Sequence, residues 1–127
     1  MPTPRILLAE DDRFLRKAAE TMLRRGGFTV TTAADGEEAL RLAQEAPPDL
    51  LLLDLIMPKM QGFDVLAALK ASPATAGIPV IVLSNLGQDS DVQLARARGA
   101  HDYIIKSNIA LEMLVERVRT FFAERAA

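Results

Sequence analysis

Five short apolar runs alternate with stretches of helical periodicity along this chain, and this alternation constrains the fold more than any other feature. The runs are Ile6–Ala9, Phe28–Ala33, Leu50–Leu53, Pro79–Leu83 and Tyr103–Ile105. Three of them (ILLA, LLLL and PVIVL) are continuously apolar, which is typical of parallel strands covered on both faces. The run FTVTTA alternates between apolar and polar residues, which favours a strand at an edge of the sheet.

The segments between the runs predict helices with one apolar face. A first stripe ends at Gly26-Gly27, and a wide last stripe begins at Leu111. The first stripe consists of Phe14, Leu15, Ala18, Ala19, Met22 and Leu23. Asp35 and Glu38 have the spacing of a capping box, which places a helix start there. Strict alternation predicts an α/β fold with a (βα)5 doubly wound parallel five-stranded sheet. The 127 residues are the length of one ordinary domain, so we expect a single domain over 1–127.

Composition excludes several classes of function. The net charge of −2 shows no basic excess, so we expect no direct binding to nucleic acid. The chain has no cysteine, which rules out disulfides and thiolate metal sites. No apolar stretch approaches the length of a membrane span, and the first residues do not form a signal peptide. We therefore expect a cytoplasmic protein without membrane insertion.

Polar residues follow the apolar runs at the carboxyl ends of the predicted strands, where open α/β sheets bind ligands. Glu10 and Asp11 follow the first run, Asp54 the third, Ser84 the fourth and Lys106 the fifth. Two carboxylates about 4 Å apart repel by about 4 kcal/mol at an effective dielectric near 20, so such a cluster needs a cation. Hard oxygen ligands without His or Cys favour Mg²⁺.

Each of these residues also has an ordinary interpretation. Asp12 is equally well explained as the N-cap of the first helix, Ser84 as a loop hydroxyl, and Lys106 as a surface lysine. Their convergence on one sheet edge favours a site. The only histidine, His101, falls in a predicted turn, which argues against a histidine kinase or phosphotransfer module because such a module carries its histidine on a helix.

Four blocks carry a family resemblance: ILLAEDD, LLLDLIMPKMQG, IPVIVLSNLG and GAHDYIIK. In order, and over essentially the whole chain, they resemble the signature blocks of response-regulator receiver domains. Ser84, Tyr103 and Lys106 follow Asp54 by 30, 49 and 52 residues, which is similar to the spacing in chemotaxis-type receivers. The resemblance implies a flavodoxin-like sheet of strand order 2-1-3-4-5 and a stand-alone receiver without an effector domain.

The resemblance also implies residue roles. Asp54 would accept a phosphoryl group and, with Asp11, coordinate Mg²⁺ directly. Glu10 would coordinate the ion through water, and the main-chain carbonyl of Ile56 would be a further ligand. Such a chain catalyses only its own phosphorylation and dephosphorylation, so it is a switch rather than an enzyme acting on other molecules.

Ser84 and Lys106 would bind the phosphoryl oxygens, and Ser84 with Tyr103 would form the switch. The implied partners are a sensor histidine kinase or a histidine phosphotransfer protein as donor, and a downstream target protein. We expect the output face to be the fourth helix, the fifth strand and the fifth helix.

The chain departs from the family pattern in two places beside the predicted site. Lys106 is followed by Ser107, where the family usually has a proline in a cis bond, and a cis bond before a non-proline residue costs about 3–4 kcal/mol. The backbone is therefore expected to run differently there, with Ser107 or Asn108 capping the last helix. Asn85 stands where the family usually has a small residue, and it either crowds the phosphoryl pocket or forms a hydrogen bond to it.

Two apolar residues near the acceptor are expected to modulate the lifetime of a phosphorylated state. Ile56 and Leu86 lie two residues after Asp54 and two after Ser84, where polar side chains could orient a hydrolytic water. Apolar side chains cannot do this, so we expect slow hydrolysis. The amide of Asn85 could substitute as the orienting group.

Two other functions compete with an active receiver. A degenerate receiver would act as a phosphorylation-independent protein-binding module, but the complete set of acids, acceptor and lysine argues against it. A haloacid-dehalogenase-type phosphatase also has a nucleophilic aspartate after an apolar strand. It requires a second aspartate two positions later, and Ile56 occupies that position.

Overall fold

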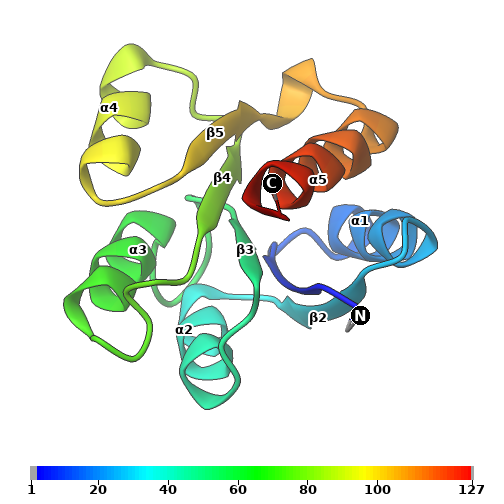
Figure 1. The fold of residues 1–127 in the computed structure, drawn as a ribbon. Coiled ribbons are helices and arrows are strands. Elements are labelled where there is room, and N and C mark those ends of the chain that lie inside the picture. The colour runs from blue at the N-terminus through cyan, green and yellow to red at the C-terminus, as the bar shows by residue number, and fades with distance from the viewer. Residues whose placement is uncertain (1–2, 127) are drawn as a thin grey trace.

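The protein folds into a five-stranded parallel sheet with helices on both faces (Figure 1). The structure is a computed structural model and describes residues 3–126. The strands are β1 (Arg5–Ala9), β2 (Thr29–Ala33), β3 (Leu50–Leu53), β4 (Val80–Ser84) and β5 (Asp102–Ile105). The helices are α1 (Arg13–Arg25), α2 (Gly36–Glu45), α3 (Gly62–Ala71), α4 (Asp89–Ala97) and α5 (Leu111–Ala126), with a 3₁₀ turn, η1 (Lys106–Asn108), before α5. The order β2-β1-β3-β4-β5 confirms the expected topology, and β2 lies at an edge as its alternating pattern predicted.

The register of the sheet places the acidic residues side by side. Ala9 at the end of β1 pairs with Leu53 at the end of β3. The next residues of the two strands, Glu10 and Asp54, therefore leave the sheet at the same edge. The backbone N–H of Asp54 still donates to the carbonyl of Ala9 at 3.1 Å, which fixes this juxtaposition.

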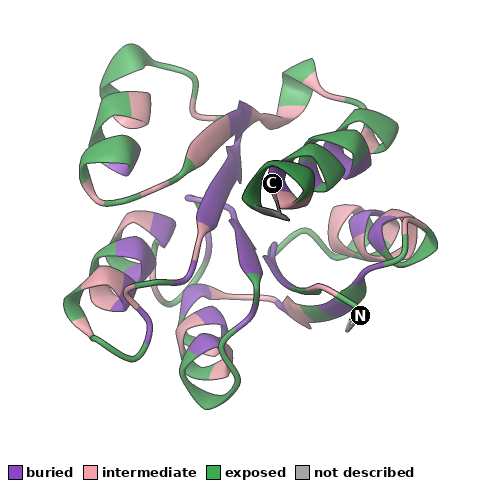
Figure 2. Ribbon diagram, in the orientation of Figure 1, coloured by how far each residue is buried: buried purple, intermediate pink, exposed green. Residues whose placement is uncertain are grey.

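The continuous apolar runs are explained by a core on each face of the sheet, since successive side chains of a strand point to opposite faces. Leu50 and Leu52 pack in the core beneath α1 and α5, whereas Leu51 and Leu53 pack against α2, α3 and α4. All four leucines of β3 are fully buried, which contributes about 1.5–3 kcal/mol for each side chain. In Figure 2 the central strands are accordingly buried and the outer faces of the helices exposed.

Helix α1 begins and ends where the sequence indicates, but one of its predicted core residues is not buried. Asp12 is the N-cap: its carboxylate accepts from the backbone N–H of Phe14 and Leu15, both at 3.0 Å. The chain leaves the helix through Gly26 and Gly27. The φ of Gly27, 100°, lies in the left-handed region that favours glycine. Phe14 is 85% exposed, so its assignment to the apolar stripe was wrong.

The predicted N-cap of α2, Asp35, is confirmed, although the return bond of Glu38 goes to the residue before the cap, whereas the predicted cap of the last helix was wrong. The N–H of Glu38 donates to Asp35 Oδ1 at 2.8 Å, and Glu38 in turn accepts from the N–H of Ala34 at 2.7 Å. Ser107 and Asn108 do not cap α5, because they belong to η1 and the helix begins at Leu111. The Lys106–Ser107 bond is trans, since residues 3–126 contain no cis peptide bond.

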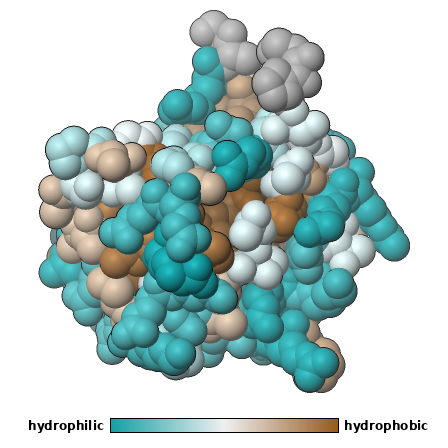
Figure 3. All heavy atoms as spheres, turned by 90° about the horizontal axis from the view of Figure 1, so that it is seen from below, coloured by the Kyte–Doolittle hydropathy of each residue, from teal (hydrophilic) through white to brown (hydrophobic). Residues whose placement is uncertain are grey.

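Figure 3 shows one face, seen from below, on which the apolar side chains appear in the middle between hydrophilic ones. Within the described part of the chain, every helix is too short or too polar to cross a membrane.

Candidate functional site

The carboxyl ends of the strands bring together the acids and the lysine that the sequence singles out. Glu10, Asp54 and Ser84 are buried, with exposed fractions of 2%, 5% and 0%. Asp11 is exposed at the mouth of the site, and Lys106 lies half-buried above the sheet edge. A hydroxyl, an ammonium and three carboxylates thus lie where β1, β3, β4 and β5 end.

Lys106 contacts two carboxylates from two other strands. Its Nζ donates to Asp54 Oδ2 at 2.8 Å and forms an ion pair with Glu10. Burial alone would lower the pKa of the lysine, but the hydrogen bonds and charges of Asp54 and Glu10 outweigh it and raise that pKa. Burial raises the pKa of Glu10, and Lys106 offsets part of that rise. The lysine is therefore held as a cation between the two acids.

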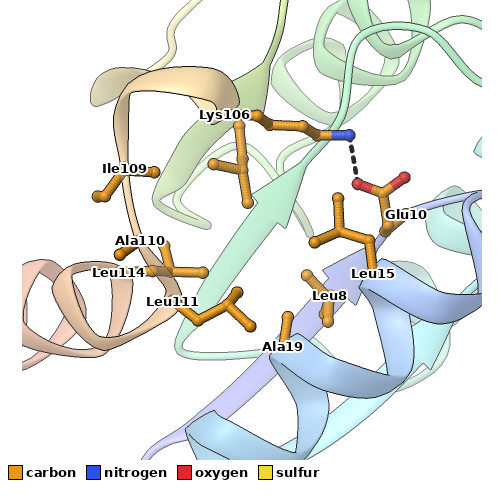
Figure 4. Close-up of a pocket in the computed structure, with 10 residues that line it drawn as sticks. Leu8, Glu10, Leu15, Ala19, Lys106, Ile109, Ala110, Leu111 and Leu114 are labelled. Atoms are coloured by element: carbon orange, nitrogen blue, oxygen red, sulfur yellow. Dashed lines mark ion pairs between the residues drawn. The ribbon is translucent and has the colours of Figure 1, made fainter.

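The ion pair of Lys106 and Glu10 has an apolar cavity of about 80 Å³ on one side, between α1 and α5 (Figure 4). Its lining is almost wholly aliphatic and includes Leu8, Leu15, Ala19, Leu83, Ile109, Ala110, Leu111 and Leu114. In Figure 4 the two charged groups meet at the rim of this cavity. Their aliphatic surroundings account for the strong effect of burial on both groups.

The acids form a group whose chemistry fits a divalent cation. One carboxylate oxygen from each of Glu10, Asp11 and Asp54 lies within 4.8 Å of the others. Lys106 pairs with two of these three carboxylates, Glu10 and Asp54. Hard oxygen donors without His or Cys suit Mg²⁺. The donor set therefore fits the ion that the sequence predicts.

The loop that carries two of these acids is fixed by its own hydrogen bonds. The N–H of Asp12 donates to Glu10 Oε2 at 3.0 Å. The guanidinium of Arg16, one turn into α1, donates to the carbonyl of Glu10 at 2.8 Å and to that of Asp11 at 3.2 Å. The acids are thus held in place from the helix that follows them.

The loop after Asp54 folds back on the Asp54 carboxylate. The N–H of Ile56 donates to Asp54 Oδ1 at 3.2 Å, so each carboxylate oxygen has a donor. The Ile56 side chain is 57% exposed. The N–H of Gly62, the first residue of α3, donates to the carbonyl of Leu55 at 2.9 Å. This contact brings the start of α3 against the backbone that follows Asp54.

Ser84 and Tyr103 both contact the loop after β4. The Ser84 hydroxyl accepts from the N–H of Leu86 at 3.3 Å, and the Tyr103 hydroxyl donates to the Leu86 carbonyl. Burial raises the pKa of Tyr103, and the charges of Asp91 and Asp54 add to the rise. The two predicted switch residues therefore share one loop segment.

Asn85 lies beside the site but points to a different partner than the sequence suggests. Its Oδ1 accepts from the backbone N–H of Ser107 at 3.0 Å. The side chain thus joins the loop after β4 to the turn after Lys106, and its oxygen is engaged.

Comparison with known proteins decides the family. The family model described as "Response regulator receiver domain" matches residues 6–119. This chain belongs to the response regulator receiver domain family. The receiver is 40% identical over 125 residues to the transcriptional regulatory protein PrrA of Mycobacterium leprae, covering 98% of this chain and 52% of that protein. It spans about half the length of the curated relatives it matches.

Solved receiver structures have the same fold. The receiver domain of the Francisella response regulator 1452 superposes with a TM-score of 0.88 at 28% identity, covering 97% of this chain and 99% of the other. A chain of the CheX–CheY–BeF3–Mg²⁺ complex from Borrelia burgdorferi gives 0.85 at 30% identity, with coverage of 96% and 90%. The two-component receiver fold expected from the sequence is thereby confirmed.

Sequence reasoning missed two features of the receiver's site. Arg16 was not singled out, although its position one turn after the N-cap Asp12 is a signal that it could reach the carbonyls before the helix. The hydrogen bond between Asn85 and Ser107 was also missed, and their separation of 22 residues gives no signal for it.

Proposed function

We propose that this receiver accepts a phosphoryl group from a phosphohistidine onto Asp54 in a Mg²⁺-dependent reaction. The observation that carries the proposal is the buried Asp54 carboxylate, which is bound by Lys106 and lies within 4.8 Å of the carboxylates of Glu10 and Asp11. A buried acid in such a group is exposed to strong repulsion unless cations accompany it. The site is thus suited to bind a cation and then a phosphoryl group.

In the proposed transfer, an oxygen of Asp54 attacks phosphorus as the bond between phosphorus and the histidine nitrogen breaks, and the electron pair of that bond stays on the imidazole. Asp11 and Asp54 would hold Mg²⁺ directly, Glu10 through water and Ile56 by its main-chain carbonyl. The bound ion would neutralise charge on the phosphoryl oxygens. Lys106 and Ser84 would bind the same oxygens. Lys106 would then exchange the Asp54 carboxylate for a phosphoryl oxygen.

A small donor with a phosphorus–nitrogen bond tests this chemistry directly. Phosphoramidate with Mg²⁺ should add one phosphoryl group to the chain, as measured by intact mass, and a chelator should prevent the addition. The competing function, a degenerate receiver that binds partners without phosphorylation, predicts an unchanged mass under both conditions. The complex of the similar Borrelia protein with BeF3 and Mg²⁺ supports the proposal of a phosphorylatable receiver over that of a degenerate one.

Signalling would proceed through a downstream target protein that contacts α4, β5 and α5. The donor would be a sensor histidine kinase or a histidine phosphotransfer protein. Ser84 and Tyr103 both contact Leu86 at the start of the loop before α4, so a shift of Ser84 toward a phosphoryl group would move the surroundings of Tyr103. We expect amide shifts on binding beryllofluoride to concentrate in residues 84–105. If the largest amide shifts outside the site were in α2 instead, the output face would lie elsewhere.

The phosphorylated state should be long-lived for a receiver. Hydrolysis requires a water aligned with phosphorus, and the exposed, apolar Ile56 cannot orient one. The Asn85 oxygen is engaged with Ser107. Losing one water-orienting contact raises a barrier by about 1–3 kcal/mol, which is roughly ten- to a hundredfold in rate. Ile56→Asn and Leu86→Glu should therefore accelerate loss of the phosphoryl group, followed by intact mass over time. Unchanged decay in both variants would mean that water access is controlled elsewhere.

A further inference from the structure

A single side-chain hydrogen bond joins the two loops that follow Ser84 and Lys106. Asn85 Oδ1 accepts from the N–H of Ser107 at 3.0 Å. Each partner comes directly after a residue of the site, one from β4 and the other from β5. The bond therefore ties together the backbone that carries the hydroxyl and the backbone that carries the ammonium.

This bond exists only because the chain departs from the family pattern at both positions. A proline at 107 would have no backbone N–H to donate, and a small residue such as alanine at 85 would have no side-chain oxygen to accept. The peptide bond before Ser107 is trans, and η1 is closed by a hydrogen bond from the N–H of Ile109 to the Lys106 carbonyl at 3.3 Å. Asn85, which lies outside the turn Lys106–Asn108, thus fixes the position of that turn through its contact with Ser107.

The location of the bond indicates what it does. Asn85 and Ser107 are both exposed, so their hydrogen bond adds little to the stability of the fold. Lys106, by contrast, is half-buried, and its Nζ reaches Asp54 Oδ2 at 2.8 Å through a long, flexible side chain. A small change in the direction of its backbone becomes a larger displacement at Nζ. The aim of the lysine therefore depends on how the turn after it is held.

We propose that Asn85 is a positioning residue that aims Lys106 at a phosphoryl group on Asp54 by holding the N–H of Ser107. This proposal rests on the proposed function, because it assigns Asn85 a part in forming that same site. The bond also makes the loop after Ser84 and the turn after Lys106 move together as the phosphoryl group is bound.

Beryllofluoride, a phosphoryl mimic, is the probe that tests this role. Its affinity in the presence of Mg²⁺ is measured by titration, and stability by urea unfolding without it. Asn85→Ala and Asn85→Leu, which both remove the accepting oxygen, should each weaken binding about three- to tenfold, the range for one lost hydrogen bond. Their urea midpoints should stay close to that of the wild type. Ser107→Ala is the matched control: it keeps the N–H and should bind as the wild type does.

The double variant Asn85→Ala/Ser107→Ala shows whether only the main-chain N–H of Ser107 takes part in the bond. It should bind as Asn85→Ala does, since the serine side chain contributes nothing to the hydrogen bond. A further loss in the double variant, or wild-type affinity in Asn85→Ala, would overturn the role of Asn85 while leaving the phosphoryl site intact. Failure of the wild type itself to bind would instead contradict the phosphoryl site, and the positioning role with it.

Hydrogen exchange at the Ser107 amide provides a readout that does not depend on ligand binding. Exchange should be faster in Asn85→Ala than in the wild type, because the N–H loses its acceptor. Equal exchange rates would show that the bond does not hold the turn, and would overturn the proposal.

Discussion

Replacing Lys106 by methionine should destabilise the protein by about 3 kcal/mol when no divalent ion is present. The change removes the ammonium that contacts both Glu10 and Asp54, whose side chains are only 3% and 7% exposed. Two buried carboxylates would then face each other without this cation, which is the costly way to break a buried ion pair. Urea unfolding in chelator measures the loss directly.

Added Mg²⁺ should restore more stability to this variant than it adds to the wild type. An ion that binds only the folded state stabilises that state, and the gain grows with the logarithm of the ratio of the ion concentration to the dissociation constant of the ion. In the variant the ammonium no longer competes for the carboxylates. The matched control is Lys17→Met on α1, whose lysine is 77% exposed and forms a long ion pair with Glu20 at 3.8 Å. A Lys106→Met midpoint equal to that of the control would contradict the account of this ion pair.

Gly62→Ala should destabilise the protein by about 1 kcal/mol and reduce phosphorylation. A Cβ at this position would lie 2.6 Å from the Cα of Leu55 and closer still to the carbonyl oxygen of Asp54. Alanine is better than glycine in a helix by about 1 kcal/mol. A clash with backbone costs about 1–3 kcal/mol, and occasionally more, because neither strand end nor helix start can yield without moving the acceptor. The clash therefore outweighs the helical preference.

Gly77→Ala is the control for this substitution, because a Cβ there would meet nothing within 4 Å. The control should unfold at the wild-type urea concentration and label normally with acetyl phosphate. Equal stability of the two variants would show that the close approach of α3 to the acceptor loop is unimportant.

The fold could be predicted from sequence because its strongest signals are local. The run LLLL has no polar residue, so both faces of β3 must be covered, and the helical segments between the runs provide that cover on the two sides. Strand ends were accurate to about one residue, as for β4, which spans Val80–Ser84 rather than Pro79–Leu83. The order of the strands, however, came from the family resemblance and not from the apolar pattern.

The errors occurred where local periodicity does not decide the structure. Phe14 continues the apolar stripe of α1, but it lies in the first turn of the helix and is exposed there. Ser107 and Asn108 are good cap residues, yet they form η1 and α5 starts later. The periodicity of apolar residues describes one helix at a time, so it contains no information about the tertiary contacts of the first and last turns of that helix.

The candidate residues of the site were predicted, but not the contacts among them. Glu10, Asp11, Asp54 and Lys106 follow apolar runs, so the topology alone brings them to one edge. That Lys106 pairs with Glu10 as well as with Asp54 depends on the direction of long side chains, which sequence spacing does not specify.

Intact mass after incubation with acetyl phosphate and Mg²⁺, compared between the wild type and Asp54→Asn, tests the central claim most directly. Asparagine keeps the shape of the side chain but lacks the nucleophilic carboxylate. The wild type should gain the mass of one phosphoryl group, and Asp54→Asn should gain none. Labelling of Asp54→Asn to the same extent as the wild type would contradict the assignment of Asp54 as the acceptor.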